Sequence, residues 1–542
     1  MVKKPHCRIS KAMNILEKNI SNTICLSLSC WFALCVFLTS DELCERENEI
    51  KWYMAKSGGC VLLIVYALFC NKVRCTITHY SILILLRSLF LVGSFLAIHG
   101  ILQFFLFLPS NHSMFRVTGS FENPAGISAV LAMLLPIGLH WSVSKINRAS
   151  LISSILVILV LATIILSGAR AAMLAAFLSI ITVLVMHTSI RKWLRQHKNY
   201  LCVFVVLLIG LVIGLYCWKS DSVLGRLYVW RIALSLSFED LVTGLGVDGF
   251  RAHYMLQQAD YFNHFPYSYY AELADNISHP FNEFIYILVN YGFLGLIAFV
   301  GFMFFVIIQT FKKKQRYSSV VISTILTLFV LCLFSYPLRY APVWIVFILV
   351  SILTFQQYLP QSVHYMFRLA ILTFSIYSLC ILSKDMIANK NWKRISDRAL
   401  AGYSEQMLPY FQYLHDNTCL RENPYFLYNY AAELNYSGKY SESVGIIKEC
   451  QEYLNDYDVV ILLADNYSEL NMPDSTLKFA RLASLMIPCR FLPLNYMLNA
   501  YIEKDYDELA KKVAKEILSK PVKVNSAFVD DIRNDAKIIL NQ

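Results

Sequence analysis

Long apolar runs alternate with short polar connections from the N-terminus of the chain to Leu382. A helix needs about 20 mostly apolar residues to cross the hydrocarbon core of a bilayer. Runs of roughly this length predict about eleven membrane-spanning helices, with ten or twelve as alternatives because some runs are short and one contains Arg87. The expected spans are Ile24–Thr39, Gly58–Val73, Ile82–Leu108, Ala125–Trp141, Leu151–Leu166, Ala171–His187, Leu201–Trp218, Phe281–Thr310, Ser319–Tyr336, Val343–Tyr358 and Met366–Leu382.

Two polar stretches interrupt or end this pattern. Residues 219–280 form the only expected connection between spans that is long enough to fold by itself. After Leu382 the chain is charged and rich in Tyr and Asn, and amphipathic helices are expected at Ser475–Met486 and Glu508–Ser519. Each ends just before a proline, and Pro488 and Pro521 are 33 residues apart. That spacing resembles tetratricopeptide repeats, with a generic helical domain as the alternative.

The predicted protein is therefore all-α, with a transmembrane domain at residues 1–383 and a helical repeat domain at residues 384–542. Composition supports a polytopic membrane protein, because 57% of the 542 residues are hydrophobic and only 16% are charged. A net charge of +11 suits nucleic acid in a soluble protein, but in a membrane protein Lys and Arg set the orientation, so no nucleic-acid partner is expected. The 15 cysteines are scattered, without CxxC or metal-ligand spacing.

The basic residues predict the orientation of the spans. Short cytoplasmic connections carry an excess of Lys and Arg, and alternate connections do so here, at residues 72–74, 145–148, 191–198 and 312–316. We expect a cytoplasmic N-terminus, a first span that is retained rather than cleaved as a signal peptide, and a C-terminal domain on the opposite face. The same face receives Arg116, Arg170, Arg226, His279 and Arg339, from five separate connections.

These residues suit the recognition of an anionic, lipid-linked substrate. The planar guanidinium of Arg binds diphosphate through several donors and keeps its charge, and Arg226 shares one helical face with Trp230. A neutral imidazole such as that of His279 can accept a proton from a hydroxyl group. Taken singly, each residue also has a purely structural explanation. The motif at Arg116 is compatible with a plain interfacial turn, Arg170 with the end of a helix, and His279 with an inert interfacial residue. Within the predicted transmembrane domain, residues 1–383, there is no DxD, HExxH or P-loop motif, so we expect neither a metal nor a cofactor.

In order along the chain stand GSFENP (119–124), SGAR (167–170), GR followed by Trp230, GLGVDGF (244–250), HPFNEF (279–284) and YGFLGL (291–296). This order, over Arg116 to Leu353, resembles the superfamily of O-antigen ligases, O-antigen polymerases and bacterial protein O-oligosaccharyltransferases. The resemblance implies a GT-C-type glycosyltransferase in the inner membrane that acts at the periplasmic face. It would move a glycan from undecaprenyl diphosphate to an acceptor hydroxyl without a metal.

Carried onto this sequence, the resemblance implies that Arg170 and Arg226 hold the diphosphate, with Arg116 and Arg339 as weaker candidates. His279 would be the base. The family often has its imidazole where this chain has Phe281, so Glu283 and Glu272 are alternative bases.

The sequence does not identify the acceptor. Lipid A core, a growing glycan and protein hydroxyls are all compatible with the ordered motifs. We expect a ligase. A periplasmic repeat domain would also suit recruitment of a protein partner. A lipid-linked glycan transporter is a second hypothesis, but ionisable residues would then line a path through the membrane, whereas here the candidates gather at one face. A scaffold is a third, and it would leave the ordered motifs without a role.

Overall fold

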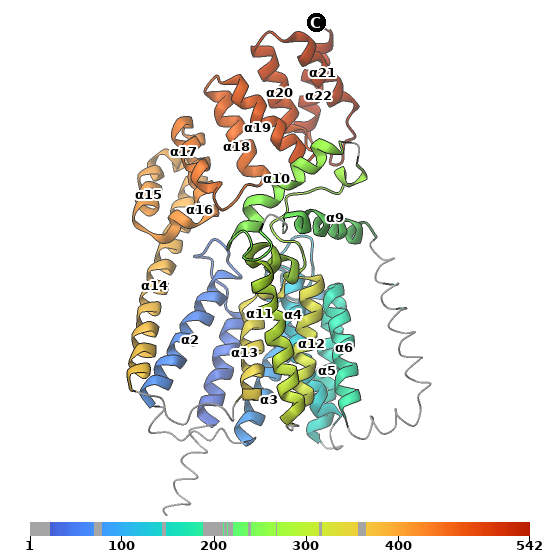
Figure 1. Ribbon diagram of the computed structural model, residues 1–542, viewed down its shortest axis with the longest axis vertical. Helices are drawn as coiled ribbons and strands as arrows, with labels where there is room; N and C mark the ends of the chain where they lie inside the picture. The colour runs from blue at the N-terminus through green and yellow to red at the C-terminus, as the bar shows by residue number, and fades with distance from the viewer. Residues whose placement is uncertain are drawn as a thin grey trace, which may run out of the picture. The chain divides into compact units, whose positions relative to one another are not determined.

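The computed structural model describes residues 22–69, 79–143, 148–187, 220–236, 240–266, 268–313, 317–355 and 365–541, together with Gly210 and Gly214. The regular secondary structure of these residues is entirely helical, with no strand (Figure 1). Apart from those two glycines, the expected span Leu201–Trp218 lies outside the described residues, as do most of the basic connections that predict the orientation. An all-α fold is confirmed for the part of the chain that is described.

The chain divides into two compact units. Residues 1–215 and 299–386 form one, which we call the membrane unit. Residues 216–298 and 387–542 form the other, which we call the loop–tail unit because it combines the long polar segment with the C-terminal helices. Helices α11 and α14 each contribute residues to both units.

Each of the other ten expected spans overlaps a described helix. In the part of the chain that the structure describes, five helices are long and apolar enough to cross a membrane and four more are apolar but shorter, which supports a polytopic membrane protein; the exact number of spans stays a prediction. The helices that overlap expected spans are Asn22–Phe37, α2 (Glu49–Phe69), α3 (His79–Phe104), α4 (Pro124–Ser142), α5 (Arg148–Leu166), α6 (Arg170–Met186), α11 (Glu283–Lys313), α12 (Ser318–Phe334), α13 (Ala341–Phe355) and α14 (Tyr365–Arg398).

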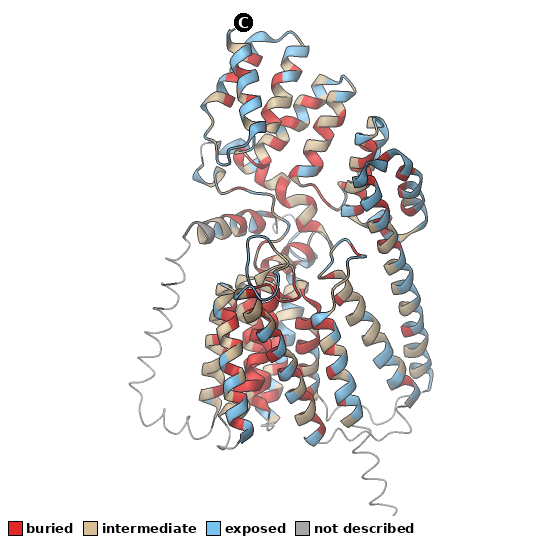
Figure 2. Ribbon diagram, turned by 180° about the vertical axis from the view of Figure 1, so that it is seen from behind, coloured by how far each residue is buried: buried red, intermediate tan, exposed pale blue. Residues whose placement is uncertain are grey.

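Helix α4 is the core of the membrane unit. Every residue from Gly126 to Leu139 is buried, and α4 packs against α3, α5, α6, α12 and α13. The long helix that starts at Tyr365 is the opposite case, because few residues of its apolar stretch are buried (Figure 2). Large exposed apolar side chains on a membrane helix are suited to contact with lipid rather than with protein.

The C-terminal helices pack consecutively, each against the next. They are α15 (Ser404–Asn417), α16 (Pro424–Tyr436), α17 (Tyr440–Cys450), α18 (Tyr457–Glu469), α19 (Pro473–Met486), α20 (Leu492–Glu503), α21 (Asp507–Ser519) and α22 (Ala527–Asn541). Both amphipathic helices expected from the sequence are present, as α19 and α21.

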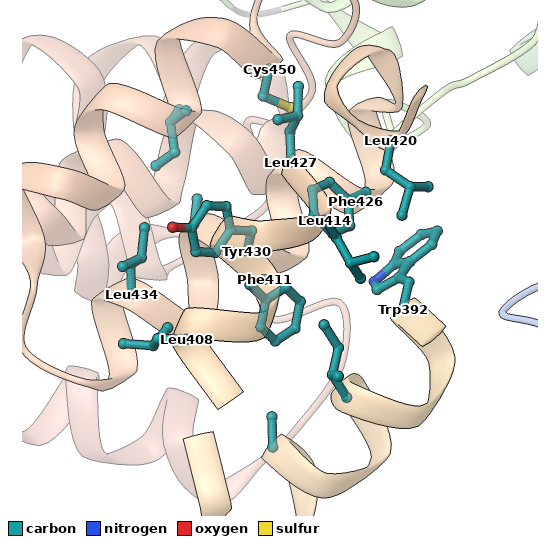
Figure 3. Packing of buried hydrophobic residues seen from close by; sticks show 14 of the residues in the cluster. Trp392, Leu408, Phe411, Leu414, Leu420, Phe426, Leu427, Tyr430, Leu434 and Cys450 are labelled. Atoms are coloured by element: carbon teal, nitrogen blue, oxygen red, sulfur yellow. The ribbon is translucent and has the colours of Figure 1, made fainter. Parts of the chain in front are cut away.

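The helix starts repeat at the expected spacing. Pro424 of α16 and Tyr457 of α18 are 33 residues apart, as are Tyr440 of α17 and Pro473 of α19. Figure 3 shows the core at the start of this array, where Trp392 and Phe411 converge with residues of α16. Stacked helix pairs of this kind bury their apolar faces jointly, whereas membership of the tetratricopeptide family stays a prediction.

Candidate active site

The loop–tail unit brings three of the predicted residues to one short segment, 279–283. Helix α9 (Ser220–Leu236) lies along it, with the Arg226 guanidinium 5.4 Å from the centre of the Phe281 ring. One turn later, Trp230 Nε1 donates a hydrogen bond of 2.8 Å to the carbonyl oxygen of Pro280. The spacing of Arg226 and Trp230 therefore places both on the face of α9 that contacts this segment.

Within the segment, His279 and Glu283 face each other. Nε2 of His279 is 3.6 Å from Oε2 of Glu283, whose side chain is only 4% exposed. The other ring nitrogen, Nδ1, accepts a 2.9 Å hydrogen bond from the backbone N–H of Phe281, and the ring stacks on Tyr286 at 4.7 Å. Because Nδ1 is the acceptor, the proton of a neutral His279 belongs on Nε2, directed at the carboxylate.

The turn before Glu283 has a defined shape. Phe281 has a φ of +55°, in the left-handed region that non-glycine residues rarely adopt. The side chain of Asn282 accepts hydrogen bonds from the backbone N–H groups of Phe284 and Ile285 at 2.9 and 3.1 Å, and so caps α11. Glu283 is thus held in the first turn of α11, where the helix dipole favours a carboxylate.

Helix α11 is broken at Gly292, where φ is +61° and ψ is −165°. The loop after α9 forms hydrogen bonds with backbone groups of α11 on both sides of this break. N–H groups of Leu245 and Gly246 donate to the carbonyl oxygens of Val289 and Asn290, and Phe293 and Leu294 donate to Leu241 and Val242 in return. This approach leaves no space for a side chain at Gly244, whose Cβ would lie 2.5 Å from backbone atoms of α11. The GLGVDGF and YGFLGL motifs therefore meet as one structural joint.

Asn290 extends this joint to the next helix. Its Oδ1 accepts a 2.8 Å hydrogen bond from the backbone N–H of Phe250, at the start of α10 (Gly249–His264). Asn290 is fully buried. One side chain thus links the break in α11 to the N-terminus of α10, although nothing in its local sequence signals that role.

In the membrane unit, Arg339 is enclosed by carboxylates. Its Nε and Nη2 lie 3.2 and 3.3 Å from the two oxygens of Glu122, and Nη2 is 3.4 Å from Glu45. Burial alone would lower the pKa of Arg339, but these carboxylates outweigh it and raise that pKa above its usual value. Because two acids compensate its charge, Arg339 is less suited to bind a further anion.

Residues of the GSFENP motif surround this ion pair, and the sequence analysis did not single out their side chains. Asn123 Oδ1 accepts a hydrogen bond from the Ala125 N–H, which caps α4, and another of 2.9 Å from the Tyr340 hydroxyl. Burial raises the pKa of Glu122, although the positive charge of Arg339 opposes that shift. The one sequence feature that could have indicated their role is the pair of polar side chains, Glu122 and Asn123, directly before Pro124 in a turn.

Lys51 is a second residue that the sequence analysis missed. It precedes the expected span of its helix, yet it is fully buried. Its ammonium donates to the carbonyl oxygens of Leu38, Glu47 and Ser120 at 2.9, 2.6 and 2.7 Å, so all three of its protons have acceptors. Burial lowers the pKa of Lys51 to about 7. Lys51 therefore ties the start of α2 to the turn that holds Glu122.

Arg116 is exposed at the edge of a hollow of about 530 Å³ in the connection after α3. The lining of this hollow combines polar side chains such as His112 with apolar ones such as Phe107, which is 75% exposed. Gln103 links the two sides of this connection, because its side-chain amide makes hydrogen bonds with the backbone of Pro109, Thr118 and Gly119. Arg116 thus combines a positive charge with a partly apolar surface close to a membrane helix.

Arg170 is the first residue of α6, directly after a turn at Gly168 with a φ of +70°. Ala169 at the N-cap supplies no side-chain hydrogen bond. As the first residue of α6, Arg170 lies at the positive end of the helix dipole. Glu272, the remaining alternative base, is exposed, and its carbonyl oxygen accepts a hydrogen bond from Lys523.

The predicted residues are divided between the two units. Arg116, Arg170 and Arg339 belong to the membrane unit, whereas Arg226, His279 and Glu283 belong to the loop–tail unit. Their convergence on one site stays a prediction. Among the described residues, no group of three or more His, Cys, Asp and Glu side chains is arranged to hold a metal ion.

In a comparison with protein families, residues 155–300 match the model described as "O-Antigen ligase". This segment contains Arg170, Arg226, His279 and Glu283, whereas Arg116 and Arg339 lie outside it. No curated protein matches the chain. The match confirms the resemblance seen in the ordered motifs, because residues 155–300 are similar to the O-antigen ligase family.

Proposed function

We propose that this protein is an O-antigen ligase-type glycosyltransferase that moves a glycan from undecaprenyl diphosphate to an acceptor hydroxyl, without a metal. The observation that carries the proposal is the His279–Glu283 pair, in which the carboxylate is buried and which lies near Arg226 within the segment that matches the family. The segment 279–283 supplies a proton acceptor, and α9 brings a cation suited to a diphosphate next to it.

Glu283 is the base in this proposal, and His279 is a positioning residue. In neutral His279, Nδ1 is occupied by the N–H of Phe281 and Nε2 carries the proton. The ring therefore has no lone pair left for the acceptor hydroxyl, whereas the Glu283 carboxylate has. Nε2 lies 3.6 Å from that carboxylate, which is only 4% exposed, and charged groups act more strongly on a reaction where water is largely excluded.

The reaction then balances as a substitution at the anomeric carbon. The oxygen of the acceptor hydroxyl forms a bond to that carbon, and Glu283 takes the proton that this hydroxyl loses. The bond from the carbon to the diphosphate oxygen breaks, and its electron pair leaves with undecaprenyl diphosphate. Arg226 and Arg170 stabilise the charge that develops on the leaving group, which is the larger part of such catalysis.

The other two arginines have lesser roles. The partly apolar surroundings and charge of Arg116 suit the junction between the phosphate and the hydrocarbon of the donor lipid. Arg339 is compensated by Glu122 and Glu45, so we assign it a structural role in the connection between α12 and α13.

The remaining features follow the sequence expectations. We propose a multi-pass protein of the inner membrane with a cytoplasmic N-terminus, and with the C-terminal helices, as tetratricopeptide-like repeats, in the periplasm. The acceptor is lipid A core, with a growing glycan or a protein hydroxyl as alternatives. Transport of the lipid-linked glycan is the competing function, and it predicts movement of the donor without a new glycosidic bond.

The test is transfer by the purified protein in proteoliposomes that contain undecaprenyl-diphosphate-linked glycan. Lipid A core, free repeat units and a Ser/Thr-containing protein are offered in parallel. Product on one acceptor is expected, lost with Arg226→Ala and retained with Arg231→Ala. Arg231 is the matched control because it lies on the same helix but contacts the Tyr261 ring instead. Donor that crosses the bilayer without product would overturn the proposal in favour of transport.

A further inference from the structure

The polar segment and the C-terminal helices share one hydrophobic core. Buried residues of α9 and α10 pack in the same cluster as buried residues of α11, α18 and α19, among them Tyr254, Val289, Val460 and Met486. A core residue contributes to stability through all the neighbours that exclude water around it. The elements that carry Arg226 and Glu283 are therefore not folded independently of the C-terminal helices.

Buried hydrogen bonds fix the register of this contact. The side chain of Gln258, which is 0% exposed, donates from Nε2 to the carbonyl oxygens of Met486 and Asp275 at 2.7 and 3.3 Å. Asn455, between α17 and α18, donates from Nδ2 to the carbonyl oxygen of Ala252 at 3.0 Å. Buried polar groups of this kind are costly to leave unpaired, so they select one arrangement of α10 against the C-terminal helices.

The segment that leads into His279 is held directly. Asn276 donates from Nδ2 to Asp456 Oδ2 at 3.2 Å and to Asp458 Oδ2 at 3.1 Å, at the start of α18. These contacts lie three residues before His279 in the chain. An amide donor is required at this position because the two acceptors are carboxylates, which repel a third acid.

We propose that the C-terminal helices position the catalytic turn, and that Asn276 is a positioning residue through which they do so. This inference rests on the proposed function for its effect on activity. It differs from a role in recruitment alone, because the C-terminal helices are then part of the active-site framework whichever acceptor is used. A displacement of about 1 Å at a reacting group can cost on the order of a hundredfold in rate.

The experiment compares Asn276→Asp with Asn435→Asp in the full-length protein. Asn435, on α16, also donates from Nδ2 to an aspartate, Asp465, at 2.8 Å, but both residues lie within the C-terminal helices. The two substitutions therefore place the same charge against a carboxylate, and only the first does so at the catalytic turn. Hydrogen–deuterium exchange of the peptide 268–283 and glycan transfer are measured for both, and Asn276→Ala repeats the test without added charge.

We expect faster exchange in 268–283 and a loss of kcat of roughly tenfold or more for Asn276→Asp, with a smaller change in the same direction for Asn276→Ala. Asn435→Asp should leave both readouts at the wild-type level. Unchanged exchange and turnover in both Asn276 variants would overturn the inference. If the wild type transfers no glycan, the proposed function fails, and the exchange of 268–283 alone still decides whether the C-terminal helices hold this turn.

Discussion

The break in α11 predicts that Gly292→Ala is severely destabilising. Its φ and ψ lie in a region that is essentially restricted to glycine, which costs other residues about 1–3 kcal/mol. A Cβ would also lie 2.2 Å from the carbonyl oxygen of Val242, and backbone cannot rotate away. Relief of that overlap breaks at least the bonds from Phe293 to Leu241 and from Leu294 to Val242, at about 0.5–1.5 kcal/mol each. The sum is about 2–6 kcal/mol.

Gly301→Ala is the matched control on the same helix. Nothing lies within 4 Å of a Cβ at Gly301, so alanine there should be neutral or should stabilise by about 0.5–1 kcal/mol. Both variants are reconstituted in nanodiscs, and thermal unfolding and glycan transfer are measured. Gly292→Ala should unfold well below the wild type and lose transfer. Equal midpoints and equal activity for the two variants would show that the joint between α11 and the loop at 241–246 does not constrain the site.

Three further predictions concern the membrane unit. Gln103→Ala removes four hydrogen bonds and should cost about 2–4 kcal/mol of stability; a change in unfolding midpoint as small as that of a surface substitution would show that these hydrogen bonds do not hold the connection after α3. Arg339→Gln leaves both acids without their cation and should lower stability by about 0.5–1 kcal/mol, recovered in part by Glu122→Gln, and an additive double variant would exclude their coupling. Lys51 has a pKa near 7 when folded and its ordinary, higher value when unfolded, so the unfolded chain binds the extra proton above pH 7 and stability should rise from pH 7 to 9. Lys51→Met should abolish that rise, and a rise of the same size in the variant would refute the assignment.

The sequence predicts the membrane helices well because their main requirement is local. A span needs apolar length, and runs such as Ala125–Trp141 show it directly; α4 starts and ends within one residue of that range. The repeat spacing in the tail is likewise visible in the prolines. The match at residues 155–300 adds that the motif order carries family information that no single motif does.

The site is less predictable because its geometry depends on contacts between distant residues. Nothing near Arg339 indicates that Glu45 and Glu122 would enclose it, and Lys51 resembles an ordinary surface charge until burial surrounds it with carbonyl groups. The sequence favours His279 as the base. Only the backbone N–H of Phe281 at Nδ1 shifts that role toward Glu283 in our proposal.

The most direct test of this account is the rank order of two variants in single-turnover glycan transfer. Glu283→Gln keeps the size of the side chain but removes the proton acceptor, and it should lower the chemical step by about 10²–10⁴-fold. His279→Gln keeps an amide donor near the carboxylate, so it should cost less, on the order of tenfold, with donor binding unchanged in both variants. The reverse order, with His279→Gln the more damaging and Glu283→Gln close to wild type, would contradict Glu283 as the base.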